Sequence, residues 1–233
     1  MSRHESFLAG NSLPAVAFYR FGRTITTVIT RSYTRMSIYG RENIPASGAF
    51  VLAPVHRSYV DTPIAACVTT RRLRFLGKDS MWKYRWFGWI LSALGAIPVE
   101  RGTADREALR RSVAVLEGGD PLVLFPEGER KSGPTVQPMF DGAVYVALKA
   151  GVPIVPVGIG GSQMVMPKGA RFVFPRKVRV VVGEPLYPET PGGGRVSRVE
   201  LSRQSERLHA ELQRLFDLAM IDVGWTYASL DDQ

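Results

Sequence analysis

The feature that most constrains the fold is a repeated alternation of short apolar runs with stretches of helical character. Runs that are apolar at nearly every position are typical of strands buried on both faces of a parallel sheet. The predicted strands are AFVLAP (49–54), RLRFLG (72–77), AIPVE (96–100), PLVLFPEG (121–128), VPIVPVGI (152–159) and VRVVVGEP (178–185). The predicted helices cover 59–70, 80–94, 103–119, 140–150 and 197–220. This order predicts an α/β fold with a mostly parallel sheet covered by helices.

A further amphipathic helix is predicted ahead of the sheet, over residues 13–38. Its apolar stripe consists of Val16, Phe18, Phe21, Ile25, Val28 and Ile29, and Arg20, Arg23, Arg31 and Arg35 lie outside it. The stripe must cover either the sheet domain or the acyl-chain boundary of a membrane, and we favour the membrane. We therefore divide the chain into an N-terminal amphipathic membrane-associating helix, 1–38, and one α/β domain, 39–233.

Composition narrows the class of protein. The chain has 233 residues, with 30 Lys and Arg against 21 Asp and Glu, and the net charge of +9 favours nucleic acid, an anionic membrane or phosphorylated substrates as partners. Cys67 is the only cysteine, which excludes a disulfide framework and indicates a reducing compartment. We expect no cleaved signal peptide and no membrane crossing, because the uncharged, largely apolar stretch 86–99 is shorter than the roughly 20 residues of a span.

Polar clusters follow three of the predicted strands. His56 comes after 49–54, Glu100 and Arg101 end the strand at 96–100, and Glu127 and Gly128 end the strand at 121–128. In open α/β sheets, ligands bind outside the carboxyl ends of the strands. The three clusters therefore predict one shared site.

His56 is the candidate general base. A neutral imidazole suits this role near pH 7 if a partner holds its tautomer. Asp61 reaches it if His56 lies in the turn before a helix and Asp61 lies in the first turns of that helix. The alternative is a structural histidine at a helix start. No G-x-S-x-G motif is present, so the base would activate a group of the substrate and not a protein nucleophile.

Two arginines predict a phosphate site. Arg101 and Arg130 each follow a strand end, and a guanidinium binds phosphate oxygens with two parallel hydrogen bonds. The alternative is that each is a solvated surface charge. No G-x-x-x-x-G-K-[ST] motif occurs, which argues against triphosphate binding of the P-loop kind.

Four segments in this order resemble the motif blocks of the lysophosphatidate acyltransferase family of glycerolipid acyltransferases. They are HRSYVD with its H-x-x-x-x-D spacing, GAIPVERG, FPEGER and GVPIVPVGI. The resemblance covers roughly residues 40–185, and the joint occurrence of the blocks is specific, whereas H-x-x-x-x-D alone is weak. It implies a glycerolipid-acyltransferase-like fold for residues 39–233.

The resemblance also implies an activity and a role for each site residue. A fatty acyl group would pass from an acyl thioester to the free hydroxyl of 1-acyl-glycerol-3-phosphate, giving phosphatidate. His56 would be the base and Asp61 its orienting carboxylate. Arg101 and Arg130 would grip the acceptor phosphate, and Glu127 and Gly128 would form the pocket between them. In the fourth block, Pro153 and Pro156 would lie near the acyl donor.

Several partners and alternatives belong to the same interpretation. The co-substrate would be acyl-CoA or an acyl-carrier-protein thioester, with no cofactor and no metal. Other acceptors stay open: glycerol-3-phosphate, another lysophospholipid or a glycolipid. Three positions depart from the family pattern: Val55 replaces a frequent asparagine, Glu129 a usual threonine and Glu100 a usual aspartate. A carboxylate at Glu129 would weaken phosphate binding at Arg130 or change the preferred acceptor.

A lipid substrate implies contact with membrane lipids. The segment MWKYRWFGWILSALG contains Trp82, Trp86, Phe87 and Trp89, which suit a membrane interface, beside two basic residues. A tryptophan-rich core helix is the alternative. We expect a peripheral membrane protein on the cytoplasmic face. The non-enzyme rival, a basic nucleic-acid- or membrane-binding protein, is disfavoured, and no nucleic-acid partner is expected, because the sequence has no nucleic-acid-binding motif.

Overall fold

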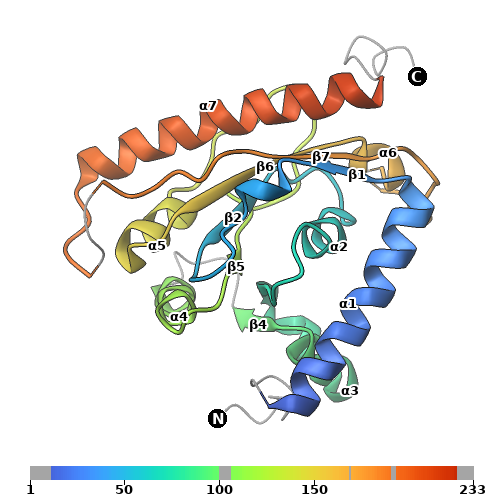
Figure 1. Ribbon diagram of the computed structural model, residues 1–233, viewed down its shortest axis with the longest axis horizontal. Helices are drawn as coiled ribbons and strands as arrows, with labels where there is room; N and C mark the ends of the chain where they lie inside the picture. Colours follow the sequence, from blue (N-terminus) through green and yellow to red (C-terminus); the bar gives the residue numbers. More distant parts are fainter. Residues whose placement is uncertain (1–11, 100–105, 168, 190–192, 225–233) are drawn as a thin grey trace.

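A seven-stranded, mostly parallel sheet forms the centre of the molecule (Figure 1). The computed structural model describes residues 12–99, 106–167, 169–189 and 193–224. In spatial order the strands are β1 (Ser37–Tyr39), β7 (Arg179–Val182), β6 (Ile154–Gly160), β2 (Val51–Pro54), β5 (Leu122–Val123), β3 (Arg74–Lys78) and β4 (Ala96–Val99). All neighbours pair parallel except β6 and β7, which are antiparallel. The predicted fold class is confirmed.

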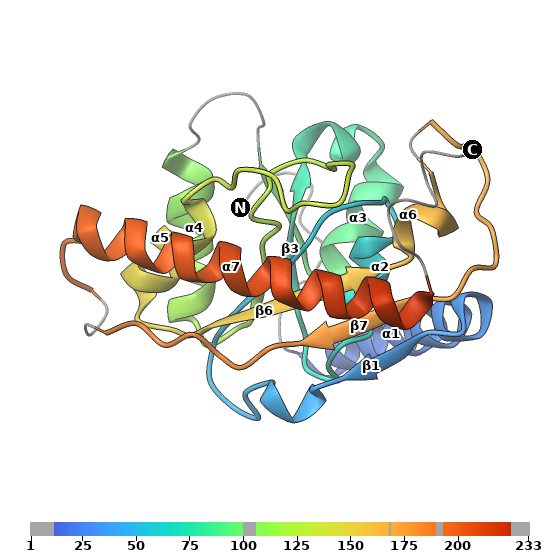
Figure 2. The same ribbon diagram turned by 90° about the horizontal axis from the view of Figure 1, so that it is seen from above.

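Helices cover both faces of this sheet. They are α1 (Leu13–Thr34), α2 (Asp61–Ala66), α3 (Arg85–Ala93), α4 (Arg106–Glu117), α5 (Gly142–Ala150), α6 (Ser162–Val165) and α7 (Arg198–Val223), with 3₁₀ turns η2 (Arg41–Asn43) and η3 (Asp79–Lys83). In Figure 1, α7 runs above the sheet and α1, α2 and α3 lie below it. Figure 2, seen from above, shows α7 lying along β6 and β7. The arrangement places the carboxyl ends of β2, β5, β3 and β4 at one edge.

The core is densest where α7 meets β6. Every residue of β6 is buried, as expected for a strand that is apolar at successive positions. Gly158 and Gly160 allow the close approach: a Cβ on Gly158 would lie 2.3 Å from the Leu215 backbone, and one on Gly160 would lie 2.4 Å from the Ala219 carbonyl. A side chain at either position would push α7 off the sheet.

The N-terminal segment differs from the prediction at its end. The helix stops at Thr34, Arg35 adopts a left-handed conformation with φ 46°, and Ser37–Tyr39 pairs with β7 as an edge strand. The prediction of helix up to residue 38 was therefore wrong, because pairing at the sheet edge supplies hydrogen bonds that local propensity does not reveal. No helix in the described ranges has the length and apolarity needed to span a membrane.

Helix α1 packs on α2 and α3 through only part of its surface. Ala15 and Tyr19 are buried, and the Tyr19 hydroxyl accepts a hydrogen bond of 3.1 Å from the Leu73 backbone N–H. The opposite side of the helix stays in solvent: Phe21, Ile25, Val28 and Ile29 are exposed. Most of the predicted apolar stripe therefore does not cover the sheet domain.

Candidate active site

The turn between β2 and α2 is built around one carboxylate. Oδ2 of Asp61, in the first turn of α2, accepts the backbone N–H groups of Arg57 and Ser58, both at 2.6 Å, and lies 3.1 Å from His56 Nδ1. Asp61 is fully buried. His56 follows β2 and Asp61 begins α2, five positions later. With this spacing the Asp61 side chain can fold back across the turn and contact His56. The prediction that the His56 and Asp61 side chains meet is confirmed.

This contact determines which imidazole nitrogen is free. A carboxylate can only accept hydrogen bonds, so His56 Nδ1 carries the hydrogen that points at Asp61. Nε2 is then unprotonated in the neutral ring and can accept a proton. The imidazole stacks on Phe125, with ring centroids 4.0 Å apart and planes inclined by 26°. Because 14% of the His56 side chain is exposed, a substrate can reach it.

A buried ion pair holds the turn from the other side. Arg57 Nη1 donates to Glu127 Oε1 at 2.7 Å, and both side chains are almost completely buried. Glu127 Oε2 accepts the backbone N–H of His56 at 2.9 Å. Arg57 also donates to the Thr135 carbonyl at 3.0 Å, and its guanidinium lies 4.9 Å from the centre of the Phe216 ring. Glu127 therefore ties the loop after β5 to the residue that would do the chemistry.

These contacts suggest a different role for Glu127 from the predicted phosphate contact. Both of its oxygens already accept protein N–H groups, and the side chain is fully buried. We assign it to positioning of His56 and Arg57. No role was predicted for Arg57 from the sequence, because a basic residue next to a histidine is typical of a protein surface. The signal that could have found it is the apolar strand before Glu127, because a buried carboxylate needs a buried cation.

Gly128 forms the sharp turn after Glu127. Its φ is +70°, which L side chains rarely adopt, and a Cβ would lie 2.6 Å from the Phe140 ring. Both the backbone conformation and the packing against Phe140 therefore require glycine at this position. The glycine allows the chain to turn from Glu127 towards Arg130 within a few residues.

Arg130 lies in the same cleft as His56. Its guanidinium lies over the Tyr59 ring, with Cζ 3.3 Å from the ring centre. None of its N–H groups forms a hydrogen bond with the described residues, so the guanidinium edge is available to an anion. Glu129, which departs from the family pattern, forms an ion pair with Lys131 at 2.8 Å.

The cleft has a polar end and an apolar end, with a volume of about 950 Å³. His56, Tyr59, Glu129, Arg130 and Lys131 line the polar end. The apolar wall consists of Phe75, Leu76, Met81, Trp82, Leu91 and Ala96, from β3, η3, α3 and the start of β4. A cleft of this kind can hold an anionic group beside an extended hydrocarbon chain.

Two predicted parts of the site are not among the described residues that line this cleft. Arg101 follows β4, together with Glu100, and both lie outside the described residues. The fourth block forms β6, where Pro156 is buried opposite Ala53 of β2. Neither Pro153 nor Pro156 is among the described residues that line the cleft.

The predicted membrane tryptophans separate into three environments. Trp82 is only 5% exposed and its indole N–H donates to Ser92 at 2.9 Å, so its predicted place at the membrane surface was wrong. The buried indole needs a hydrogen-bond partner, and α3 supplies it. Trp89 packs edge-on against Phe18 of α1, and Phe87 is half-buried. Trp86 is exposed.

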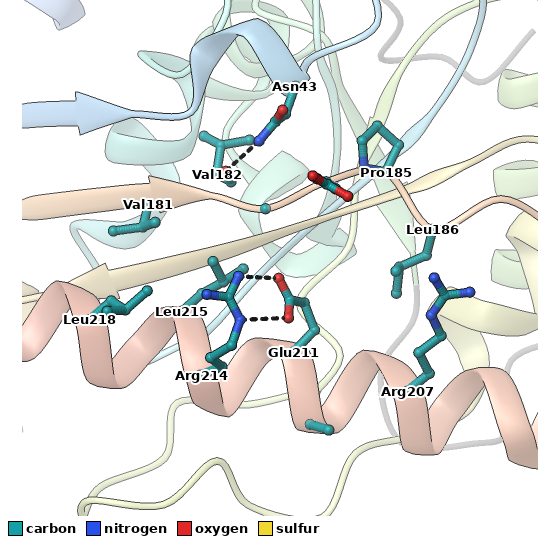
Figure 3. A pocket seen from close by; sticks show the side chains of 13 residues that line it. Asn43, Val181, Val182, Pro185, Leu186, Arg207, Glu211, Arg214, Leu215 and Leu218 are labelled. Atoms are coloured by element: carbon teal, nitrogen blue, oxygen red, sulfur yellow. Dashed lines mark hydrogen bonds and ion pairs between the residues drawn. The ribbon is translucent and has the colours of Figure 1, made fainter.

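A second hollow, of about 670 Å³, lies between α7 and the segment after β7 (Figure 3). It is lined by Arg207 and Arg214, but Arg214 is held by two hydrogen bonds to Glu211, at 2.6 and 2.8 Å. The side chains that Figure 3 labels include no histidine or cysteine. The hollow therefore offers no histidine base, and one of its two arginines is already paired, so we take the cleft at His56 as the candidate active site.

Comparisons with known proteins agree with this assignment. Residues 35–160 match a family model described as Acyltransferase, and this range contains the turn between β2 and α2 and the loop after β5. The 1-acyl-sn-glycerol-3-phosphate acyltransferase of Bacillus subtilis (strain 168) is 26% identical over 199 residues, covering 84% of this chain and 96% of the relative.

Two further likenesses extend the picture. The lyso-ornithine lipid O-acyltransferase of Pseudomonas aeruginosa is 27% identical over 165 residues, covering 65% of this chain and 63% of the relative. Among solved structures, the 1-acyl-sn-glycerophosphate (LPA) acyltransferase PlsC of Thermotoga maritima superposes with a TM-score of 0.68 at 25% identity, covering 84% of this chain and 80% of that chain. The likeness therefore extends over most of the chain.

Proposed function

The chain belongs to the acyltransferase family, whose model matches more than half of it, and we propose that it acylates 1-acyl-sn-glycerol-3-phosphate to give phosphatidate. The observation that carries the proposal is the pairing of His56 with Asp61 at the polar end of a cleft that also holds Arg130 and an apolar wall. A base, an anion-binding cation and a hydrocarbon site are the three features that this reaction needs. The B. subtilis relative carries the name of the same activity.

The mechanism follows from the free nitrogen of His56. Nε2 removes the proton from the acceptor hydroxyl as that oxygen attacks the thioester carbonyl. Asp61 stabilises the imidazolium that forms, and its two backbone N–H contacts keep it in place. The thiol leaves and takes up the proton from the imidazolium. A thioester is already activated, so a covalent enzyme intermediate is not required.

Arg130 supports a phosphorylated acceptor. Arg130 lines the cleft with its guanidinium over Tyr59, and a guanidinium can bind two phosphate oxygens through parallel N–H groups. The free hydroxyl of a glycerol phosphate lies only a few bonds from its phosphate, which suits a base and an arginine that line the same cleft. The acyl donor, acyl-CoA or an acyl-carrier-protein thioester, would place its chain along the apolar wall.

Thiol release from donor and acceptor pairs tests the proposal. The acceptors are 1-acyl-glycerol-3-phosphate, glycerol-3-phosphate, a lyso-ornithine lipid and a monoacylglycerol that lacks phosphate; each is paired with acyl-CoA and with acyl carrier protein. We expect the highest kcat/KM with 1-acyl-glycerol-3-phosphate and none of this activity in His56→Ala. Equal rates with the phosphorylated acceptor and the monoacylglycerol would contradict the phosphate site, and preference for the lyso-ornithine lipid would reassign the acceptor.

Membrane association is part of the same proposal. The exposed stripe on α1 is flanked by arginines, and an amphipathic helix with this pattern lies in the interface of an anionic bilayer. Helix α3 lies beside the N-terminal end of α1 (Figure 1), and its exposed Trp86 suits a membrane interface. We infer a peripheral attachment that brings lipid substrates to the cleft.

A further inference from the structure

The segment between α6 and β7 carries an exposed aromatic cluster that the proposed function has not used. Within Arg171–Lys177, hereafter the aromatic–basic loop, Phe172 is 76% exposed and Val173 and Phe174 are each 44% exposed. Single exposed apolar residues are ordinary, but three in succession form a patch of the kind that marks an interaction site. Burying such a cluster against a partner would be favourable, with a free energy roughly proportional to the apolar area removed from water.

The charge around this cluster is of one sign. The sequence contains no Asp or Glu from Gly161 to Gly183. Lys177 and Arg179 have structural partners on α7, since both contact Asp222. Arg171 and Arg176 form no ion pair or hydrogen bond with the described residues, and both are exposed. Two free guanidinium groups therefore flank the phenylalanines.

The loop continues the exposed stripe of α1. The Tyr33 hydroxyl donates a hydrogen bond to the Val173 carbonyl at 2.9 Å, and the Val178 N–H donates to the Thr34 carbonyl at 3.1 Å. Tyr33 lies four residues after Ile29 and is on the same side of the helix. In Figures 1 and 2 the loop lies at the C-terminal end of α1. The stripe and the loop thus form one surface.

The residues just before the loop contact the turn between β2 and α2, and Phe174 is hydrogen-bonded back to them. The Ser58 hydroxyl donates to the Met166 carbonyl at 3.0 Å, and the Phe174 N–H donates to the Val165 carbonyl at 2.7 Å. Ser58 is two residues from His56 and its N–H binds Asp61. The exposed phenylalanines therefore belong to a segment that contacts the turn bearing the base.

From these contacts we propose that the aromatic–basic loop is a second membrane-contacting element, which inserts Phe172 and Phe174 into the interface of an anionic bilayer beside α1. Aromatic rings prefer the headgroup level, and cationic side chains next to them attract anionic lipids. A bilayer fits better than a nucleic acid, because the apolar side chains are the most exposed part of the loop. The inference rests on the proposed function only in that the bilayer is the source of the acceptor.

Binding of the full chain to vesicles tests the loop directly. The variant F172S/F174S is compared with V199S/I221S, which changes two exposed apolar residues on α7. On vesicles of phosphatidylglycerol and phosphatidylcholine we expect the partition coefficient of F172S/F174S to fall at least about ten-fold. V199S/I221S should bind like the wild type. The variant R171Q/R176Q should lose affinity for these vesicles and much of the sensitivity of binding to salt.

A second measurement keeps the inference testable if F172S/F174S folds poorly. A fluorophore sensitive to polarity is attached to F172C; Cys67 is buried and should not react. We expect a blue shift on addition of anionic vesicles and quenching by lipids with a nitroxide near the headgroup. An emission spectrum that does not change while the protein is vesicle-bound would overturn the proposal. So would wild-type binding by folded F172S/F174S, or self-association that depends on Phe172 and Phe174 in place of vesicle binding.

Activity separates this inference from the proposed function. F172S/F174S should acylate a short-chain acceptor in solution at the wild-type rate and act more slowly on an acceptor held in vesicles. If vesicle binding depends on the loop but no acceptor is acylated, the proposed function fails and the loop assignment stands. If acylation is normal in vesicles for F172S/F174S, the loop assignment fails and the proposed function stands.

Discussion

At the scale of single residues, the spacing of His56 and Asp61 serves two purposes. It stabilises the turn between them, and it places a carboxylate beside the imidazole. One oxygen of Asp61 accepts two backbone N–H groups and contacts the imidazole, so the same carboxylate closes the turn and selects the tautomer. Asp61→Asn distinguishes these two roles. An asparagine oxygen can still accept the backbone N–H groups and close the turn, but it carries no charge to stabilise an imidazolium.

We therefore expect Asp61→Asn to fold and to turn over slowly. Loss of the charge that stabilises the imidazolium should lower kcat by about a hundred- to ten-thousand-fold, the range of general-base effects. Steady-state kinetics at saturating donor and acceptor, with a thermal melt of the same sample, measure both properties. A kcat close to that of the wild type would show that Asp61 only closes the turn.

Glu127 shows how a residue expected to bind substrate can instead position the catalytic turn. Glu127→Gln leaves the Arg57 guanidinium buried without its counter-charge, and breaking one side of such a pair costs about 3–5 kcal/mol. We expect a clearly lower free energy of unfolding in urea. The exposed carboxylate of Glu107, which pairs with Arg110, is the matched control, and Glu107→Gln should change stability little. Unchanged stability of Glu127→Gln with a raised acceptor KM would favour the phosphate contact.

At the scale of elements, α1 is joined to the sheet domain by a buried tyrosine. The Tyr19 hydroxyl accepts the Leu73 N–H ahead of β3. Burial raises the pKa of Tyr19 above its usual value of 10.0, more than the Leu73 hydrogen bond and the nearby arginines lower it. The folded state thus holds this proton more tightly than the unfolded chain does.

Tyr19→Phe should lower the free energy of unfolding by about 1–3 kcal/mol near pH 8, because the buried Leu73 N–H loses its acceptor. As pH rises past 10.0, the unfolded wild type releases the tyrosine proton before the folded protein does, so the wild type loses stability that the variant never had. The difference in free energy of unfolding between the wild type and Tyr19→Phe should therefore become smaller above pH 10.0. Urea midpoints at pH 8 and above pH 10 test this; a constant gap would contradict the direction of the shift.

At the scale of the whole molecule, α1 lies on the side of the sheet opposite α7 (Figure 1), and its exposed stripe continues into the aromatic–basic loop at its C-terminal end. Deleting residues 1–38 is not a clean test of membrane contact. It would remove most of β1 and the buried Met36 along with the stripe. Substitutions on the exposed side of α1 leave the core intact.

We expect the full chain with Ile25→Ser and Ile29→Ser to keep its melting temperature and to bind anionic vesicles more weakly. The apolar stripe supplies burial, and each nearby arginine adds about 1 kcal/mol at an anionic surface, so salt should weaken the wild type too. Vesicle sedimentation over a salt series measures both effects. Wild-type binding by the double variant would move the contact to other parts of the surface.

The sequence by itself determined the parts of this protein that depend on local pattern. Continuous apolar runs predicted the buried strands of a parallel sheet, because both faces of such strands are covered. The position of His56 after a strand and of Asp61 at a helix start predicted their meeting, because only four residues of turn separate them. The ordered motif blocks predicted the family and the reaction in a different way, through their resemblance to the lysophosphatidate acyltransferase family.

Only the tertiary structure decided what depends on distant partners. The ion pair of Arg57 with Glu127 joins residues 70 positions apart, and the Ser37–Tyr39 strand exists because β7 lies beside it. Trp82 turns inward because Ser92 accepts its N–H, and the stripe of α1 stays exposed because α2 and α3 cover only its other side. Which side chains are buried, and which distant residues pair, depends on which surfaces meet in the folded protein. The local periodicity of the sequence does not contain this information.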